Sequence, residues 1–346
     1  MLLDMRKMKI LQAIIDDYIL SASPVGSRTI SKRSDIGLSS ATIRNEMSDL
    51  EELGLLEQPH TSAGRIPSDK AYRLYVNDML RRWQLTDQEA RFINTHIDRR
   101  VDEVEDIIKQ TAWVLANVTH YTSMVLKPQL SDIKLKQIQL IPISSGRALA
   151  VIITDAGITR DAVIRIPAGM RDSDMERLSN MLTAKLSSRK LEDVHSRLMP
   201  ELSYEFSEYR DFCVSLVQKL QRDIKPDAAG VELSGATNIF NHPEYSDLDK
   251  AKGILNALEA KDMLYCLLRD AVKLEFSVTI GSEHQNPEMK NCSVVTATYR
   301  IGDSPIGSLG VIGPTRMDYS RILAVLEYVG QSLSEILTNL LEDERT

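Results

Sequence analysis

Residues 39–67 read SSATIRNEMSDLEELGLLEQPHTSAGRIP, and this stretch decides how the first part of the chain folds. Either Ser39 or Ser40 can cap a helix at its start, and Gly54 stands where a left-handed residue ends it. The segment after Gly54 predicts two short strands around an Ala-Gly turn, which is a β-hairpin with a polar tip. The helix has one buried face, because its apolar residues recur at helical spacing: Ile43, Met47, Leu50 and Leu53.

Two further helices are predicted before this stretch and one after it. Residues 5–19 carry apolar side chains at helical spacing, and a turn containing Pro and Gly follows. Ser27 can cap a short second helix, which Asp35 and Gly37 end. Another helix is expected to open at Pro67 and Ser68. The order helix, helix, turn, helix, hairpin predicts a winged helix-turn-helix, which places its third helix in the DNA major groove.

The outward face of the third helix carries small and polar side chains that suit a DNA groove. An Arg can bond to guanine O6 and N7 together, so we expect Arg44 to read a base, with Asn45 and Thr42 in lesser roles. We expect Gly64 to free the hairpin turn and leave the Arg65 guanidinium projecting toward phosphates or the minor groove. A plain solvated helix face is the alternative interpretation. The predicted DNA-binding residues are Ser27, Arg28, Ser39, Ser40, Thr42, Arg44, Asn45, His60, Ser62 and Arg65.

The chain of 346 residues carries a net charge of -7, which is distributed unevenly. Residues 1–83 hold 12 basic and 11 acidic residues, and the remainder holds 30 basic and 38 acidic ones. A polyanion such as DNA should therefore meet only the first module. With 43% hydrophobic and 26% charged residues, the composition is that of a globular protein of two or three domains.

Neither a membrane span nor a disulfide framework is expected. No stretch approaches the roughly 20 uncharged residues that a bilayer span needs, and the start of the chain does not resemble a signal peptide. The odd number and wide spacing of Cys213, Cys266 and Cys292 argue against disulfides and against a CxxC metal site. We therefore expect a cytoplasmic protein in a reducing compartment.

The rest of the chain predicts an α+β body. Helices are expected over residues 86–97, 101–121, 173–224 with an interruption at Pro200, 246–273 and 319–341. Three successive strand-like runs separated by turns predict an antiparallel meander: residues 137–143, 147–154 and 159–166. Three further strands are expected over residues 274–281, 292–302 and 304–313.

No motif predicts an enzyme, a cofactor or a metal. The six histidines form none of the usual metal-binding spacings, and His195 beside Asp193 is a weak dyad because adjacent helix residues point apart. Asp172 and Asp174 are better explained as residues that start a helix. The glycines at 307, 310 and 313 lack the GxGxxG spacing and are more plausible as turn and close-packing residues.

Dimerisation is expected, because a lone winged helix contacts too few bases to select a genomic site. The last helix could supply a dimer seam, since apolar residues keep heptad spacing from Ile322 to Leu340. We favour the alternative, that this stripe covers the protein's own sheet.

Three segments closely resemble the HrcA family of heat-inducible transcription repressors: PVGSRTIS at 24–31, SSATIRNEMSDLEELGLLEQPHTSAGRIPSDKAYRLYV at 39–76 and VIGPTRMDYSR at 311–321. The match in order and spacing runs over nearly the whole chain and is weakest over residues 130–225. Ser68 and Ala71 stand where members often have Thr and Gly, beyond the wing.

The resemblance implies a homodimeric repressor of three parts. They are a winged helix-turn-helix over residues 1–83, a GAF-like α+β domain formed by 84–130 and 226–346, and an inserted α+β dimerisation domain over 131–225 with a small antiparallel sheet. It also implies binding to an inverted-repeat operator called CIRCE upstream of chaperone operons. The GroEL chaperonin is implied as the partner that keeps the repressor competent until heat-damaged proteins compete for it.

Two other functions stay open at this point. A metabolite-responsive repressor would hold a small effector in the GAF-like domain. A chaperone-network adaptor would act through protein contacts and would tolerate a mutation confined to the recognition helix.

Overall fold

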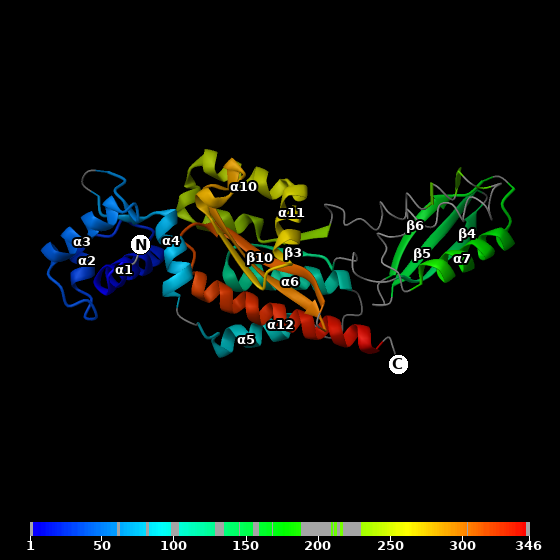
Figure 1. The fold of residues 1–346 in the computed structure, drawn as a ribbon, viewed down its shortest axis with the longest axis horizontal. Helices are drawn as coiled ribbons and strands as arrows, with labels where there is room; N and C mark the ends of the chain where they lie inside the picture. The colour runs from blue at the N-terminus through cyan, green and yellow to red at the C-terminus, as the bar shows by residue number, and fades with distance from the viewer. Residues whose placement is uncertain are drawn as a thin grey trace. The chain divides into compact units, whose positions relative to one another are not determined.

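The computed structural model describes residues 3–60, 63–80, 83–97, 104–128, 135–144, 146–154, 159–167, 169–187, 209, 211–212, 215–216, 230–302 and 304–343 (Figure 1). The chain divides into two compact units. Unit 1 comprises Met1–Leu126, Val231–Arg300 and Gly307–Ser334, and unit 2 comprises Lys127–Gly230, Ile301–Ile306 and Glu335–Thr346. The division does not test the predicted domain boundaries or the GAF-like identity, which stay predictions.

The first part of unit 1 is the predicted winged helix-turn-helix. Its elements are α1 (Met5–Ser21), α2 (Ser27–Ser31), α3 (Ser40–Glu52), β1 (Leu56–Glu57), β2 (Ile66–Pro67) and α4 (Asp69–Leu74), which continues as the π-helical turn η1 (Tyr75–Met79). Strands β1 and β2 pair antiparallel as the hairpin. The apolar faces of the three leading helices are buried together, including Ile14, Ile30 and Ile43, so hydrophobic burial holds the module.

The helix ends agree with the sequence at α3 and differ at α2. The Ser39 side chain accepts a hydrogen bond from the Thr42 backbone N–H, and Gly54 has a φ of 70°. The prediction that Ser27 caps the second helix is wrong, because the Gly26 carbonyl accepts the first helical bonds from Thr29 and Ile30. Ser27 is therefore the first residue of α2, which ends at Ser31, earlier than predicted.

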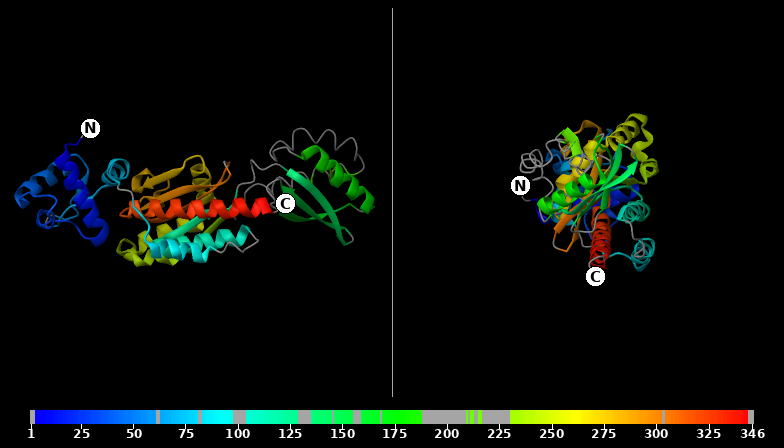
Figure 2. Two further views of the ribbon diagram at one scale, coloured as in Figure 1. Left: turned by 90° about the horizontal axis from the view of Figure 1, so that it is seen from below. Right: turned by 90° about the vertical axis from the view of Figure 1, so that its right-hand side faces the viewer.

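The second part of unit 1 is a five-stranded sheet in the order β7-β3-β10-β9-β8. The strands are β3 (Thr122–Leu126), β7 (Val231–Ser234), β8 (Phe276–Ile280), β9 (Cys292–Ile301) and β10 (Ser304–Pro314). The helices around it are α5 (Asp87–His96), α6 (Val104–Thr119), α10 (Leu248–Glu259), α11 (Lys261–Ala271) and α12 (Tyr319–Asp343) (Figures 1 and 2). The helix predicted over 246–273 is thus two helices, α10 and α11, with Ala260 between them.

Strand β3 shows how the sheet buries both faces. Met124 and Leu126 belong to the same apolar cluster as α10 and α11, whereas Ser123 on the other face donates to the Ala112 carbonyl of α6. Side chains alternate along a strand, so one strand can contact helices on both sides. All five β3 residues are accordingly buried.

The apolar stripe of α12 covers the protein's own sheet. Ile322, Leu326, Val329 and Leu333 are at most 1% exposed in a single chain. A Cβ built on Gly330 would lie 3.7 Å from Leu309 of β10 and from the Thr298 carbonyl of β9. The stripe is therefore already buried and is not the exposed seam that a dimer contact through these residues would need.

Unit 2 contains the predicted antiparallel meander in the order β4-β5-β6. The strands are β4 (Leu135–Ser144), β5 (Arg147–Thr154) and β6 (Thr159–Arg165), and α7 (Asp172–Leu186) packs against the sheet. The Ser179 hydroxyl accepts from the Leu140 backbone N–H at 2.9 Å, which ties α7 to β4. Most of the helical region predicted after α7, with its interruption at Pro200, lies outside the described residues.

The two ends of the segment 127–230, the longest stretch of unit 2, lie side by side. The Lys127 N–H donates to the Gly230 carbonyl at 2.7 Å, and Leu126 pairs with Val231 where β3 meets β7. The chain therefore leaves unit 1 at the end of β3 and returns to it at the start of β7, which pairs with β3. None of the described helices is long and apolar enough to cross a membrane.

Candidate nucleic-acid interface

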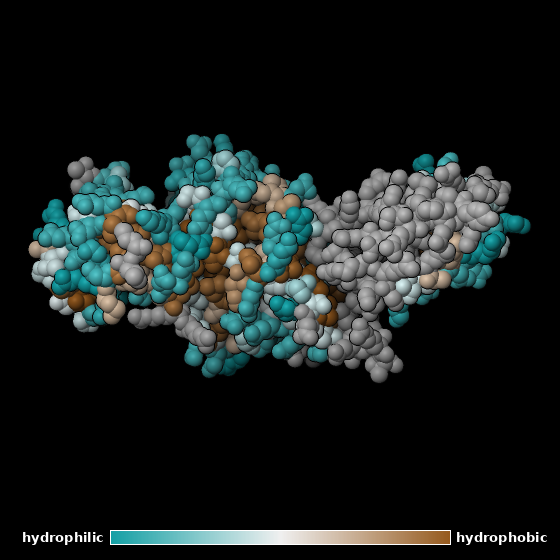
Figure 3. Space-filling model, viewed as in Figure 1, coloured by the Kyte–Doolittle hydropathy of each residue, from teal (hydrophilic) through white to brown (hydrophobic). Residues whose placement is uncertain are grey.

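Helix α3 presents the outward face that the sequence predicted. Ala41, Arg44, Asn45 and Ser48 are exposed, and the opposite residues Ile43, Met47 and Leu50 are buried. In Figure 3 the visible surface of the winged helix is mostly hydrophilic. Small and polar side chains on an exposed helix can approach base edges closely.

The hydroxyls at the start of α3 are engaged in local bonds. Ser39 Oγ lies 2.9 Å from Thr42 Oγ1 and accepts from the Thr42 backbone N–H at 3.1 Å. Thr42 and Ser40 are half-buried, so Arg44 and Asn45 are the freer side chains on this helix. The first turn of α3 is thus held in place by its cap, which positions Arg44 one turn further on.

Ion pairs hold several cations of the winged helix. Lys7 Nζ lies 3.0 Å from both Glu46 and Asp49, and these carboxylates raise the pKa of Lys7. Arg33 likewise pairs with Asp17 at 3.2 Å. Other basic side chains make neither an ion pair nor a hydrogen bond within the described part of residues 3–80. They include Lys9, Arg28, Lys32 and Arg44. Arg28 on α2 and Arg44 on α3 are exposed cations on two helices that contact each other.

Arg65 does not project from the wing as predicted. Its guanidinium bonds to Glu51 near the end of α3, with Nη2 at 2.8 Å from Oε2, and the side chain is 19% exposed. Its backbone N–H and carbonyl both bond to Val25 at 2.9 Å, so Val25 adds a third extended segment beside the hairpin. The cause is a carboxylate from a helix 14 residues earlier, which local sequence patterns do not reveal.

Gly64 is required by close packing and not by turn freedom. A Cβ at this position would lie 2.5 Å from the Val25 carbonyl carbon and oxygen, well inside contact distance. The prediction that Gly64 frees the turn is therefore wrong, since the Val25 backbone leaves no room for a side chain there.

We expect Gly64→Ala to weaken the bridge between Val25 and Arg65. The added methyl group must push two backbone segments apart. The free energy needed to open the bridge between Val25 and Arg65 should therefore fall by about 1–3 kcal/mol. Hydrogen exchange at the Val25 and Arg65 amides would measure this change. Gly253→Ala is the matched control, because its Cβ would have 3.7 Å of clearance in α10 and an alanine favours the helix. Unchanged exchange in Gly64→Ala would contradict the packing argument.

The remaining wing residues are placed only in part. His60 is exposed, and its carbonyl accepts from the Ala63 N–H at 2.8 Å in the turn. Ser62 lies outside the part of the chain that the structure describes. Ser27 is half-buried at the start of α2, beside the exposed Arg28. Direct DNA contact by any of these residues stays a prediction.

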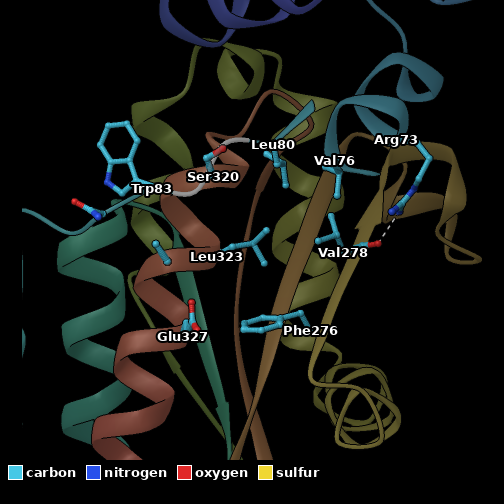
Figure 4. Close-up of a pocket in the computed structure, with 11 residues that line it drawn as sticks. Arg73, Val76, Leu80, Trp83, Phe276, Val278, Ser320, Leu323 and Glu327 are labelled. Atoms are coloured by element: carbon cyan, nitrogen blue, oxygen red, sulfur yellow. Dashed lines mark hydrogen bonds between the residues drawn. The ribbon is translucent and has the colours of Figure 1, made fainter. Parts of the chain in front are cut away.

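Sequence patterns did not predict the contact between α4 and the loop after β8. Arg73 Nη2 donates to the Val278 carbonyl at 2.6 Å (Figure 4), and Arg73 Nε donates to Glu283 at 2.7 Å. Asp69 accepts from the Ser282 N–H at 2.7 Å. The residues involved are more than 200 positions apart, so the only available signal was the charge of Asp69 and Arg73 on a short helix.

The residues considered for catalysis have structural roles where they are described. The Asp174 carboxylate accepts from the Arg171 N–H at the start of α7. A Cβ on Gly307, Gly310 or Gly313 would clash with neighbouring groups, so these are close-packing glycines. His195 lies outside the described residues. Among the residues described, no group of three or more His, Cys, Asp or Glu could hold a metal ion.

Comparisons with known proteins agree with this geometry. A family model described as "Winged helix-turn-helix transcription repressor, HrcA DNA-binding" matches residues 2–80, and one described as "HrcA protein C terminal domain" matches residues 105–323. A protein of Ruminiclostridium cellulolyticum called "Heat-inducible transcription repressor HrcA" is 45% identical and covers 99% of this chain and 100% of its own. A protein of the same description from Brevibacillus brevis is 42% identical, covering 97% and 98%.

A solved structure is also similar over nearly the whole length. It is described as a hypothetical protein, is 26% identical and has a TM-score of 0.64, covering 98% of this chain and 100% of that chain. The winged helix and the α+β remainder therefore occur together in another protein.

Proposed function

Because the chain belongs to the HrcA family of heat-inducible transcription repressors, we propose that it binds an inverted-repeat operator of the CIRCE type as a dimer and represses chaperone operons. It is a DNA-binding transcription repressor and not an enzyme. The observation that carries the proposal is the exposed face of α3, on which Arg44 and Asn45 stand free beside a capped first turn.

In the proposed complex, α3 lies in the major groove and Arg44 bonds to a guanine with two hydrogen bonds. Arg28 on α2 binds a backbone phosphate, which fixes the position of the module without reading sequence. Two modules fixed one or more helical turns apart then read the two halves of an inverted repeat. The segment over 131–225 is proposed to hold the two chains together, since the seam considered on α12 is buried within one chain.

We expect Arg28→Gln and Arg65→Gln to affect the salt dependence of DNA binding differently. Loss of a phosphate contact by Arg28 should reduce the slope of log K against log [salt] by about one unit per half-site. Arg65 is already neutralised by Glu51, so its replacement should leave the slope unchanged. Operator titrations at several salt concentrations would measure both slopes. A reduced slope for Arg65→Gln alone would show that the wing, and not α2, contacts the phosphates.

Loss of repression on heating is proposed to follow from folding, with the GroEL chaperonin setting the active fraction. Long-range strand pairings such as β3 with β10 form slowly and leave apolar surface exposed in the meantime. Cys292 is poorly suited to act as a thiol sensor, because burial raises the pKa of its thiol to about 12. Cys266 is exposed, and Cys213 is outside the described residues.

The test is refolding from denaturant at fixed protein concentration, followed by titration of an inverted-repeat chaperone promoter. We expect several-fold more operator-binding protein when the chaperonin and ATP are present. A variant with all three cysteines replaced by serine should show the same gain and the same loss of binding on heating. Equal recovery with and without chaperonin would overturn this part of the proposal, and a cysteine-free variant that no longer responds to heat would indicate a thiol sensor.

A metabolite-responsive mode of repression remains the second candidate. It is favoured by a cavity between α11 and the sheet, because two of the residues that line it have a buried polar atom with no partner in the described part of the chain. A chaperone-network adaptor is distinguished by mutation of α3, which would leave its activity intact.

A further inference from the structure

A cavity of about 630 Å³ lies between α11 and one face of strands β8 and β9. Ser277 pairs with Thr296, and Thr279 pairs with Val294, so these four residues share one face of the two strands. Met263 and Leu267 of α11 lie across from them, and all six residues line the cavity. The walls thus combine a row of small polar groups on the sheet with an apolar cover from the helix.

Two residues that line this cavity each carry a buried polar atom with no hydrogen-bond partner among the described residues. Thr296 is 2% exposed, and its Oγ1 bonds to nothing. His284 is 7% exposed, and its Nε2 bonds to nothing. Buried polar groups are nearly always bonded, because an unmade bond costs stability. Because two residues with such atoms line the same cavity, this cavity is the place where a bound molecule would complete both bonds.

His284 offers an acceptor in this cavity. Burial lowers its pKa, although Glu283 and the carbonyls of Thr279 and Cys292 partly offset the effect. The ring is therefore neutral at pH 7. A neutral imidazole has one N–H. Since Nε2 has no partner among the described residues, the Thr279 and Cys292 carbonyls beside the ring favour placing that N–H on Nδ1. The unpartnered Nε2 then carries a lone pair that needs a donor from a ligand.

A larger cavity of about 760 Å³, which Figure 4 shows, lacks this feature. Its guanidinium, from Arg73, is already bonded to the Val278 carbonyl and to Glu283. None of its lining residues is among those with a buried, unpartnered polar atom in the described part of the chain. Cavity size alone therefore does not single it out as a binding site.

The charges around the smaller cavity restrict the ligand. Asp270 and Glu283 line it, and its described lining contains neither Lys nor Arg. Arg73 and Arg269 pair with these two carboxylates from outside the lining, so an anion in the cavity would find no cation in its walls. We propose that this cavity binds a small nitrogen-containing molecule, uncharged or cationic, that donates an N–H to His284 Nε2 and bonds to Thr296 Oγ1. Its apolar body lies against Met263 and Leu267.

The cavity is joined to the DNA-binding module through its own lining. Glu283 accepts from Arg73 of α4, and the neighbouring Ser282 N–H donates to Asp69 at the start of that helix. A ligand that bonds to His284 acts on a segment directly attached to α4. Resting on the proposed function, the inference is that this ligand changes the affinity of the repressor for its operator.

Benzamidine and benzoate are matched probes, because they share a flat ring and differ in charge and in N–H donors. Titration calorimetry on the full chain should give a benzamidine dissociation constant of about 1 mM or tighter, in the range of small fragments. Benzoate should bind at least about tenfold more weakly. In a chain labelled with ¹⁵N-histidine, benzamidine should shift the Nε2 resonance of His284, assigned by its absence in His284→Gln. No benzamidine binding, or equal binding of benzoate, would overturn the site.

Thr296→Val separates a ligand role from a structural one. It removes a hydroxyl without a partner, so the free chain should melt at the same or a higher temperature, whereas benzamidine should bind about fivefold more weakly. Thr298→Val is the control on the same strand, because its hydroxyl bonds to the Leu274 carbonyl at 2.6 Å and it does not line the cavity. It should lower the melting temperature and leave benzamidine affinity unchanged. Unaltered benzamidine affinity in Thr296→Val would contradict the assignment.

The regulatory step has its own readout. Saturating benzamidine should change the operator affinity of the wild-type chain by at least about threefold and should change that of Thr296→Val much less at the same concentration. A chain that binds both probe and operator, with no effect of one on the other, would overturn the coupling. A chain that binds benzamidine but no operator would contradict the proposed function while supporting the site.

Discussion

Replacing residues 128–229 with an Asn-Gly turn is expected to give a monomer whose affinity for an inverted-repeat operator is at least about 1,000-fold lower. The backbone can accommodate this deletion, because the Lys127 N–H already bonds to the Gly230 carbonyl. A two-residue Asn-Gly loop can join two residues that are bonded in this way. The apolar cluster of unit 2 runs from Ile138 to Leu216 and would be removed whole. The cluster behind the five-stranded sheet, from Met124 to Ile312, contains none of the deleted residues.

Sedimentation would measure the mass of this variant, and titration would measure its binding to the operator and to random DNA. Weak binding to random DNA should persist, because the winged helix and its exposed cations are intact. Far-ultraviolet circular dichroism and the melting temperature would control for folding. A folded variant that still sediments as a dimer would place the dimer contact in unit 1.

Arg44→Ala is expected to weaken operator binding by about 1–3 kcal/mol at each half-site and to relax the base preference at one position of each. The reason is that Arg44 is exposed on the outward face of α3 and makes neither an ion pair nor a hydrogen bond within the described residues. A set of operators with each base replaced in turn would show which position loses its preference.

Arg44→Lys is the control for charge alone. It keeps the positive charge and loses the planar pair of donors, so it should retain non-specific binding while losing most of the base preference. An equal loss on operator and random DNA in Arg44→Ala would instead assign Arg44 to a phosphate.

The winged helix could be predicted in detail because its signals are local. The spacing of Ile43, Met47 and Leu50, a serine cap at 39 or 40 and the left-handed Gly54 lie within 16 consecutive residues. The structure confirms the spacing and Gly54 and places the cap at Ser39. The cap of α2 was misplaced by one residue, since Gly26 and Ser27 are both acceptable at that position and only backbone bonding distinguishes them. The outward direction of Arg44 also followed from helical periodicity alone.

The roles of Arg65 and Gly64 were decided by tertiary structure. Glu51 and Val25 come from other elements, and nothing in the wing sequence indicates that one neutralises the guanidinium and the other excludes a side chain. The same holds for His284 and Thr296, because only the folded sheet brings these two residues, each with an unpartnered polar atom among the described residues, to one cavity.

The short strands β3 and β7, and the division of residues 246–273 into α10 and α11, were not predicted from the sequence. Local sequence patterns did predict most of the helices, strands β8, β9 and β10, the meander and the exposed face of α3. These follow from the period of each element, which depends on neighbouring residues. Only the tertiary structure decided the strand order β7-β3-β10-β9-β8, the burial of the α12 stripe and which cations remain free for DNA. Those features depend on contacts between residues up to 200 or more positions apart, such as Arg73 with Glu283, and local periodicity carries no record of such partners.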